Sequence, residues 1–291
     1  MSIMKYRKFY FAFSLILMAI SIISLLTQGL RPSIDFVGGS LLEVRSPVLA
    51  ELTSVEIIEL GSEVMALSSV QKTSDAGLIM RGEVVNNERG QELIELLRQS
   101  DPSLEQLRFE TIGPTFGREV LIKMMTAVVL VTTMIMGYIW YQFRDLKYGL
   151  CAVGAMIHDS LVVLGTFSVL GYLIGIEVDI LFVTAILTTL AFSIHDTIVV
   201  FDRIRELSAK NSKYDYAHIV DMAVLSTVGR SVNNSVTVLL MLLALTLLGG
   251  DTIRWFVFAL LVGVATGTYS SPFLAAPLLI EWDNFQKRRR F

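Results

Sequence analysis

The sequence predicts a polytopic α-helical membrane protein with six transmembrane helices and a small extracytoplasmic α+β domain of the ferredoxin-like kind. Three observations predict this fold class. First, 53% of the 291 residues are hydrophobic, only 18% are charged and the mean hydropathy is +0.62, which ordinary soluble domains do not reach. Second, six apolar runs are each about long enough to cross ~30 Å of hydrocarbon as a helix. Third, a polar segment with alternating strand and helix patterns separates the first two runs.

The first apolar run covers residues 9–28 and follows a basic tail, residues 1–8. A cleaved signal peptide is the alternative interpretation. The run is long for the apolar region of a signal peptide, and Thr27-Gln28-Gly29 is not a small-x-small cleavage site. We therefore interpret the run as an uncleaved span whose basic flank lies in the cytoplasm.

Residues 29–118 form the predicted extracytoplasmic domain, because they are polar and contain no apolar run long enough to cross a bilayer. Strand patterns occupy four short stretches, residues 40–44, 68–72, 77–84 and 107–112. Two stretches have helical spacing of apolar residues, 53–65 and 88–99. Thr53-x-x-Glu56 fits a capping box at the start of the first. The order strand, helix, strand, strand, helix, strand predicts a split βαβ arrangement.

Five further apolar runs within residues 119–280 predict a bundle of five membrane spans. The runs are residues 120–141, 149–173, 178–201, 229–248 and 254–280. A cytoplasmic loop, residues 202–228, precedes the fifth span, and a basic cytoplasmic tail, residues 281–291, follows the sixth. Lys and Arg concentrate in the loops that this topology places inside, which puts both termini in the cytoplasm. Residues 215–227 have two interpretations, a helix on the inner membrane surface or an N-terminal extension of the fifth span.

Asp196 is a carboxyl group within an apolar run. Its burial in hydrocarbon costs roughly 2.5–3.5 kcal/mol even on lenient scales, which favours a functional role. Thr189 and Ser193 fall on the same side of the predicted helix at spacings of four and three. This polar stripe should face other helices or water, because lipid offers it no hydrogen-bond partner.

A near-copy of the same motif occurs in the third span. His158-Asp159 stands in the sequence IHDSLVV, and His195-Asp196 stands in IHDTIVV in the fourth span. Coincidence is one interpretation, because short apolar sequences resemble one another. Two His-Asp pairs in adjacent spans also fit a set of groups that exchange protons within the membrane.

Arg230 in the fifth span is a candidate partner for Asp196. Asn234 and Thr237 follow on the same predicted face. Arginine stays protonated in proteins and needs an acceptor once it leaves water, so we expect Arg230 to pair with Asp196. The alternative places Arg230 among the lipid headgroups.

These polar groups fit a proton relay, in which a carboxyl that gains and loses a cationic neighbour takes up and releases a proton. An aspartic protease dyad is a weaker interpretation, because Asp159 and Asp196 fall at different depths. A metal site is also a weaker interpretation, because the sequence has no His pair at i, i+4 and no cysteine near these residues. Cys151 is the single cysteine. A scaffold held together by polar contacts is the remaining alternative. We expect no enzymatic activity, no cofactor, no metal and no nucleic acid as a partner.

Four motifs together resemble the SecF family, the smaller of the paired membrane subunits that assist the bacterial Sec protein translocase, within the SecD/SecF family of the resistance-nodulation-division (RND) superfamily. The resemblance covers nearly the whole chain, and its motifs are residues 34–39 (IDFVGG), 113–115 (GPT), 158–159 (HD) and 196–206 (DTIVVFDRIRE).

The resemblance implies a complex with SecD in the bacterial cytoplasmic membrane, acting with the Sec translocon channel and its accessory subunits. The complex would use the proton-motive force to assist translocation and release of the preprotein, in contact with membrane lipid. The family's proton-path aspartate and arginine correspond to Asp196 and Arg230. The glycines of the IDFVGG motif are interpreted as structural, and Asp35 beside them as a turn residue.

Two positions depart from the family pattern. His195 stands where the family usually has Asn, and residues 230–235 read RSVNNS where an Arg-Thr pair and more threonines are usual. His195 either joins the relay, because imidazole titrates near neutral pH, or replaces an amide hydrogen bond. The runner-up function is an RND-type half-transporter for lipids or small molecules.

Overall fold

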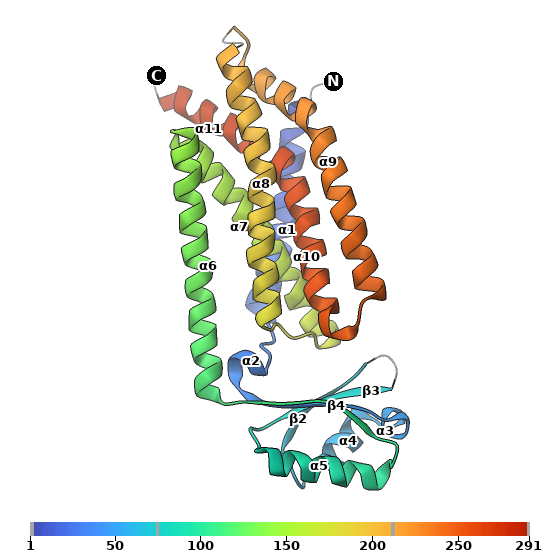
Figure 1. Ribbon diagram of the computed structural model, residues 1–291. Coiled ribbons are helices and arrows are strands. Elements are labelled where there is room, and N and C mark those ends of the chain that lie inside the picture. Colours follow the sequence, from blue (N-terminus) through green and yellow to red (C-terminus); the bar gives the residue numbers. More distant parts are fainter. Residues whose placement is uncertain (1–2, 74–75, 211–212, 290–291) are drawn as a thin grey trace. The chain divides into compact units, whose positions relative to one another are not determined.

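The protein is described here from a computed structural model, which describes residues 3–73, 76–210 and 213–289, with only the backbone described at 251 and 252. The chain divides into two compact units (Figure 1). The helical unit comprises Met1–Leu30, Ala127–Ile176 and Leu181–Phe291. The small domain comprises Arg31–Thr126 and also the distant segment Glu177–Ile180.

The small domain has the predicted ferredoxin-like topology. Its elements in chain order are β1 (Gly39–Arg45), α3 (Pro47–Glu51), α4 (Ser54–Gly61), β2 (Leu67–Lys72), β3 (Gly77–Gly82), α5 (Asn87–Ser100) and β4 (Glu105–Ile112). The strands pair antiparallel throughout in the order β2-β3-β1-β4. The sequence patterns located all four strands and both longer helices. They missed α3, which begins at Pro47 with Ser46 as its N-cap.

The core of the small domain forms because alternate strand residues point to one face of the sheet. Leu42 and Val44 of β1 and Leu78 and Met80 of β3 are fully buried there. The predicted capping box at the start of α4 is confirmed. The Thr53 backbone N–H donates to Glu56 at 2.7 Å, and the Glu56 backbone N–H donates to Thr53 Oγ1 at 3.3 Å.

The two glycines after the short helix α2 (Ile34–Val37) occupy positions that other residues would strain. Gly38 has a φ of 79° and Gly39 a φ of 138°. A Cβ on Gly38 would lie 2.7 Å from the backbone nitrogen of Pro114, and one on Gly39 would lie 2.9 Å from the carbonyl oxygen of Gly82. The glycines therefore let the chain turn into β1 against the backbone of two other segments, which supports their structural interpretation.

Among the residues that the structure describes, six helices are long and apolar enough to cross a membrane, and the predicted fold class is thereby confirmed. In chain order they are α1 (Arg7–Thr27, preceded by the 3₁₀ turn η1, Met4–Tyr6), α6 (Pro114–Phe143), α7 (Leu146–Ile174), α8 (Ile180–Lys210), α9 (Tyr216–Leu248) and a last span of three pieces. Those pieces are α10 (Asp251–Ser270), the π-helix η2 (Ser271–Ala275) and α11 (Ala276–Arg289).

The helices extend beyond the predicted spans. Much of the segment predicted as the 202–228 loop is helix, because α8 continues to Lys210 and α9 begins at Tyr216. Residues 216–227 are thus an N-terminal extension of the fifth helix, one of the two alternatives. Most of the predicted tail continues α11, and its last residues, Arg290 and Phe291, lie outside the described residues.

Helix α1 packs through small polar side chains. Its buried residues are Ser14, Ser21 and Ser24. A Cβ on Gly165 of α7 would overlap the Ser21 side chain at 2.3 Å, so the two helices meet at close range. Ser24 Oγ donates to Ser168 Oγ at 2.8 Å. This pattern is typical of membrane helices, where small residues permit close packing and hydroxyls bond across the interface.

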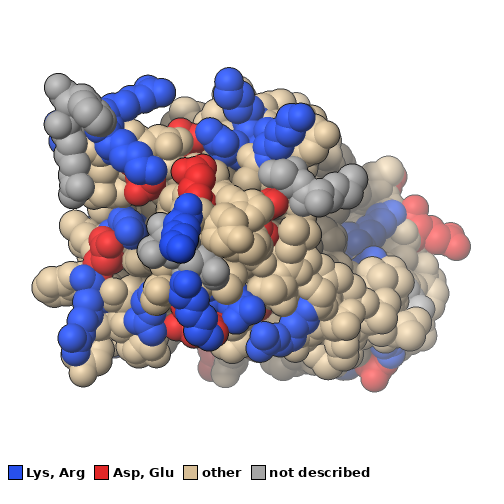
Figure 2. Space-filling model, turned by 90° about the horizontal axis from the view of Figure 1, so that it is seen from above, with Lys and Arg blue, Asp and Glu red and all other residues tan. Residues whose placement is uncertain are grey.

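Lysine and arginine side chains gather on the end of the molecule seen in Figure 2. Several pair with acids one helical turn away, including Arg203 with Glu206 and Lys287 with Asp283. Arg7 at the start of α1 pairs with Glu281 of α11 at 2.6 Å. This end of the helical unit is therefore a charged surface, in contrast to the apolar helices it terminates.

Candidate functional site

Helices α8 and α10 meet along two facing stripes of small residues. A Cβ on Gly263 would lie 2.1 Å from Thr189 Cγ2, and one on Gly267 would lie 3.2 Å from Ser193 Cα. One turn further, Thr197 Oγ1 lies 2.9 Å from Ser271 Oγ. The glycines therefore bring the polar face of α8 against α10, which positions its hydroxyls for bonding across the interface.

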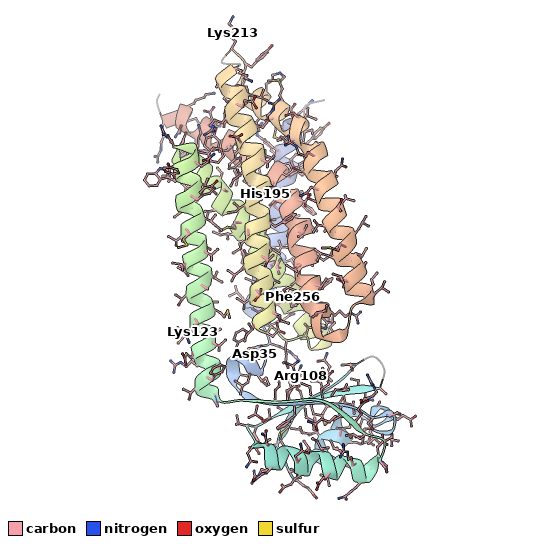
Figure 3. The ribbon with its side chains drawn as sticks, in the orientation of Figure 1. Asp35, Arg108, Lys123, His195, Lys213 and Phe256 are labelled. Atoms are coloured by element: carbon pink, nitrogen blue, oxygen red, sulfur yellow. The ribbon has the colours of Figure 1, made fainter. Side chains whose placement is uncertain are left out.

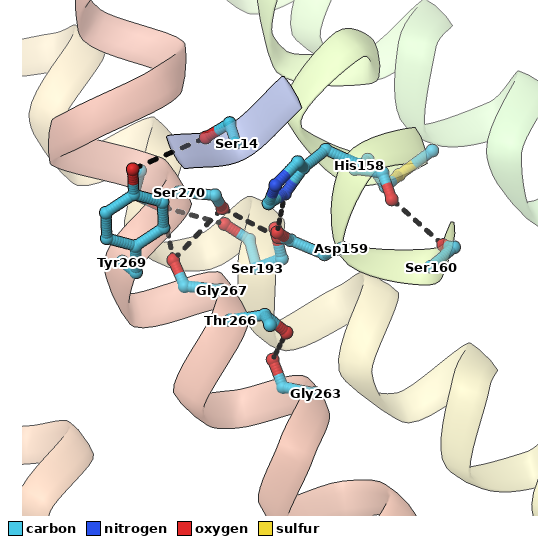
Figure 4. A network of polar contacts seen from close by, with 12 residues as sticks. Ser14, His158, Asp159, Ser160, Ser193, Gly263, Thr266, Gly267, Tyr269 and Ser270 are labelled. Atoms are coloured by element: carbon cyan, nitrogen blue, oxygen red, sulfur yellow. Dashed lines mark hydrogen bonds and ion pairs between the residues drawn. The ribbon is translucent and has the colours of Figure 1, made fainter. Parts of the chain in front are cut away.

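Asp159 of α7 is the centre of a buried hydrogen-bond network at this interface (Figure 4). Its Oδ2 accepts from Ser193 Oγ of α8 at 2.6 Å and from Ser270 Oγ of α10 at 2.7 Å. Its Oδ1 lies 2.9 Å from Nδ1 of His158. Asp159 and His158 are both buried. Three helices thus contribute polar groups to one carboxyl.

His158 has one ring nitrogen without a visible partner. Its Nδ1 faces Asp159, whereas its Nε2 is buried and makes no hydrogen bond to any residue that the structure describes. A neutral imidazole has one donor and one acceptor nitrogen, and the tautomer follows the bonds that each makes. His158 is thus a buried imidazole with one ring nitrogen bonded and the other unpaired among the described residues.

Asp196 has a different environment from Asp159. Its side chain is buried, and its Oδ2 has no hydrogen-bond partner in the described part of the chain. Ser235 of α9 faces this carboxyl, yet its Oγ is likewise buried without a hydrogen bond. His195 Nδ1 lies 3.8 Å from Asp196 Oδ1, and the His195 side chain, which Figure 3 labels on α8, is 72% exposed.

The expected ion pair between Asp196 and Arg230 is absent among the residues described. Arg230 is exposed and lines a hollow of about 400 Å³ between α8 and α9. The other lining residues are Val199, Asp202, Arg203, Glu206, Ser226 and Thr227. The buried face of α9 instead carries Ser231 and Ser235. Since successive helical residues differ by about 100° around the axis, Arg230 points away from the carboxyl.

The structure brings together part of the predicted set of polar residues. Ser193 bonds to Asp159 rather than to Asp196, and Thr189 packs against α10. Asn234 and Thr237 are exposed. Sequence reasoning missed Ser270 and the glycines of α10. The four-residue spacing of Gly263, Gly267 and Ser271 is the sequence signal from which this small-residue face could have been predicted.

The geometry gives little support to the two remaining interpretations, an aspartic protease dyad and a metal site. No hydrogen bond joins the Asp159 and Asp196 carboxyls in the described residues, since their oxygens face different groups. A shared proton of the aspartic protease kind is thus not arranged here. Within the residues that the structure describes, no group of three or more His, Cys, Asp or Glu side chains could hold a metal ion.

Helices α8 and α9 also present an exposed polar surface, which we call the α8–α9 polar face. Its members are Thr184, Thr188, His195, Arg230, Asn233, Asn234 and Thr237. Most of them lie within the apolar runs of helices long enough to cross a membrane. Polar side chains in such positions normally face other helices or water rather than lipid.

Comparisons with known protein families identify similar sequences over nearly the whole chain. Residues 92–285 match the family described as "Protein export membrane protein SecD/SecF, C-terminal", and residues 23–46 match the "SecD/SecF GG Motif". The chain is 40% identical to the protein translocase subunit SecF of Thermobaculum terrenum, covering 97% of this chain and 94% of that one. It is 38% identical to SecF of Anaerolinea thermophila, covering 100% and 97%.

Solved structures of SecDF share the fold. The crystal structure of SecDF from Thermus, titled a translocon-associated membrane protein, matches with a TM-score of 0.87 and 30% identity over 98% of this chain. SecDF in the super-membrane-facing form matches with a TM-score of 0.71 and 29% identity. This chain spans 39% and 40% of those longer chains. The relatives are named as subunits of a protein-transport system, in agreement with the expectation that this chain is not an enzyme.

Proposed function

This chain belongs to the SecD/SecF family of protein export membrane proteins, and on that premise we propose that it is an accessory subunit of the Sec translocase. Together with SecD it uses the proton-motive force to assist the translocation and release of preproteins. Its other partners are the translocon channel and its accessory subunits, the moving preprotein and the surrounding lipid. The names of its relatives and its likeness to one portion of SecDF support this assignment.

The α8–α9 polar face supports SecD as the partner within the membrane. Its members include four exposed side chains, His195, Arg230, Asn233 and Asn234. Contact of these groups with hydrocarbon is costly, so a second protein surface or a water-filled path between two subunits should cover them. The longer SecDF chains, of which this chain spans 39%, contain additional protein that is available to provide such cover.

Proton coupling is supported by the two buried carboxyls of α7 and α8. Asp196 has an oxygen without a hydrogen bond in the described structure, and Arg230 lies on the neighbouring helix without contacting it. In the proposed cycle, Arg230 approaches Asp196 in one conformation and withdraws in another. The carboxyl releases its proton in the first and takes one up in the second. His158, Asp159 and His195 extend the path along α7 and α8.

The proposed orientation places both termini in the cytoplasm and the small domain on the outer side of the bacterial cytoplasmic membrane. The Lys and Arg side chains at one end of the helical unit (Figure 2) support it, because cytoplasmic ends of membrane helices are enriched in these residues.

Asp196→Asn tests the proposed function directly. The amide keeps the shape of the side chain and cannot release a proton at neutral pH, so we expect proton-driven preprotein export to be lost while SecD still co-purifies. Asp283→Asn is the matched control, because it removes a carboxyl paired with Lys287 near the end of α11. Export at the wild-type rate in the Asp196→Asn variant would instead support a scaffold.

A further inference from the structure

The connector between α7 and α8 contributes Glu177–Ile180 to the small domain, although 50 residues, 127–176, separate this segment from the rest of that domain along the chain. Val178 forms a parallel β-bridge with Pro32, in which the Ser33 N–H donates to the Val178 carbonyl at 2.9 Å and the Val178 N–H donates to the Arg31 carbonyl at 2.8 Å. The Ile180 N–H donates to Asp35 Oδ2 at 3.2 Å. Asp35, interpreted from the sequence as a turn residue, thus also binds the start of α8.

An ion pair joins this connector to the sheet. Arg81 Nε of β3 lies 2.9 Å from Glu177 Oε2, and the two side chains are only 14% and 17% exposed. The contact is ionic without the alignment of a hydrogen bond, because neither atom has a hydrogen-bond partner among the described residues. By contrast, the Arg45–Glu105 pair on the same sheet has side chains 49% and 62% exposed.

Because both side chains are largely buried, the ionised form of each depends on the opposite charge of the other. Burial raises the pKa of the Glu177 carboxyl, and Arg81 and then Arg31 oppose the shift, whereas Asp179 and Asp35 add to it. Burial also lowers the pKa of the Arg81 guanidinium, and Glu177 opposes that change. Removal of one partner leaves a largely buried charge without compensation, whereas removal of both avoids this cost.

The connector has a special place in the chain. It leads directly from α7, which carries His158 and Asp159, into α8, which carries Asp196. Residues 175–180 must accommodate any change in the relative positions of the two helix ends, because they join those ends covalently. A connector fastened to a sheet strand transmits such a change, whereas a free loop absorbs it.

We propose that Arg81 and Glu177 are coupling residues, which fasten the α7–α8 connector to the small domain so that rearrangement of the two helices moves that domain. The inference rests on the proposed proton-driven function. It adds an ion pair within the small domain, at the segment through which the chain continues from α7 into α8. Neither residue exchanges the transported proton.

The test is a double-mutant cycle in the full chain, with Arg81→Gln, Glu177→Gln and the double variant, and with Glu105→Gln as the matched control from the exposed pair. We expect proton-driven export to fall about tenfold or more in both single variants and in the double variant. Hydrogen exchange should be about tenfold faster at the Val178 amide in all three. At the amides of β1, it should accelerate in the single variants and return toward wild type in the double variant.

Each outcome bears on one claim. Recovery of export in the double variant would overturn the inference, since the pair would then matter only because each residue neutralises the other. Unchanged export in the single variants, or unchanged exchange at Val178, would overturn it as well. If Asp196→Asn stops proton-driven export and the Arg81 and Glu177 variants do not, only this inference fails. If Asp196→Asn exports normally, the proposed function fails, and the exchange data still report whether the pair fastens the connector.

Discussion

Asp159 and Asp196 occupy nearly identical local sequences and yet have different surroundings. Asp159 accepts two serine hydroxyls and contacts a buried imidazole, whereas Asp196 has a bare oxygen and a largely exposed imidazole beside it. The sequence predicted both His-Asp pairs. It could not predict the difference, because that depends on how each helix is rotated about its axis, which packing with other helices fixes.

The position of Arg230 illustrates the same limit. Its spacing to Asn234 and Thr237 correctly groups three residues on one side of α9. Whether that side faces Asp196 depends on a rotation that the spacing leaves open, and Ser231 and Ser235 occupy the buried side instead. To predict an ion pair between two helices, one must therefore know which face of each helix is turned toward the other.

Gly38→Ala should destabilise the small domain more than Gly29→Ala. Both glycines have positive φ, +79° and +70°, which costs a non-glycine residue about 1–3 kcal/mol. Only at Gly38 does the new Cβ also meet backbone atoms, those of Pro114, because nothing lies within 4 Å of the site at Gly29.

Hydrogen exchange at the amides of β1 in the full chain measures this difference. We expect faster exchange in Gly38→Ala than in Gly29→Ala by about tenfold or more, which corresponds to about 1.4 kcal/mol. Equal effects of the two substitutions would show that the close approach to Pro114 contributes nothing.

At the scale of elements, the length of the apolar runs located the membrane helices, and patterns of period 3.6 and 2 located α4, α5 and all four strands of the small domain. These patterns missed α3, which is five residues long, and they did not indicate the π-helix η2 within the last span. Pro272 lies at the start of η2. Proline lacks an N–H and its ring crowds the carbonyl four residues earlier, which fits a widened turn at this position.

The glycine face of α10 leads to a prediction about helix packing. Gly263→Ala places a Cβ 2.1 Å from the present position of Thr189 Cγ2, so α8 and α10 must separate or Thr189 must adopt another rotamer. Overpacking of this kind costs about 1–3 kcal/mol. For a chain of this size the melting temperature should fall by about 2–10 °C.

Thermal unfolding of the purified chain in detergent measures the effect, and Gly137→Ala in α6 is the matched control. Gly137 is also within a membrane helix, and nothing lies within 4 Å of its added Cβ. Its melting temperature should stay the same or rise, because alanine has the higher helix propensity. A fall in Gly137→Ala equal to that in Gly263→Ala would contradict close packing as the cause.

At the scale of the whole molecule, hydropathy and alternation were sufficient to predict six membrane helices and one ferredoxin-like domain. Both properties are averages over many residues, so single exceptions do not change them. The assignment of residues 177–180 to the small domain was not predictable in this way. It depends on hydrogen bonds and an ion pair between segments far apart in the chain, which leave no periodic signal.

The proposed orientation predicts a specific labelling pattern. Cys151 is the single cysteine of the chain. In a Cys151→Ser background, a cysteine introduced at an exposed position is therefore the only thiol that can react. Glu63→Cys in the small domain should react with a membrane-impermeant maleimide added to spheroplasts. Lys213→Cys, between α8 and α9, should react only after the membrane is permeabilised. The reverse pattern would place the termini outside.

The bridge between Pro32 and Val178 bears on how chimeras of this family should be built. A graft that exchanges only residues 31–126 between two relatives would join a foreign sheet to a native connector, and the Arg81 and Glu177 positions would come from different parents. Residues 177–180 should therefore travel with the grafted domain, as a second insert far downstream in the gene.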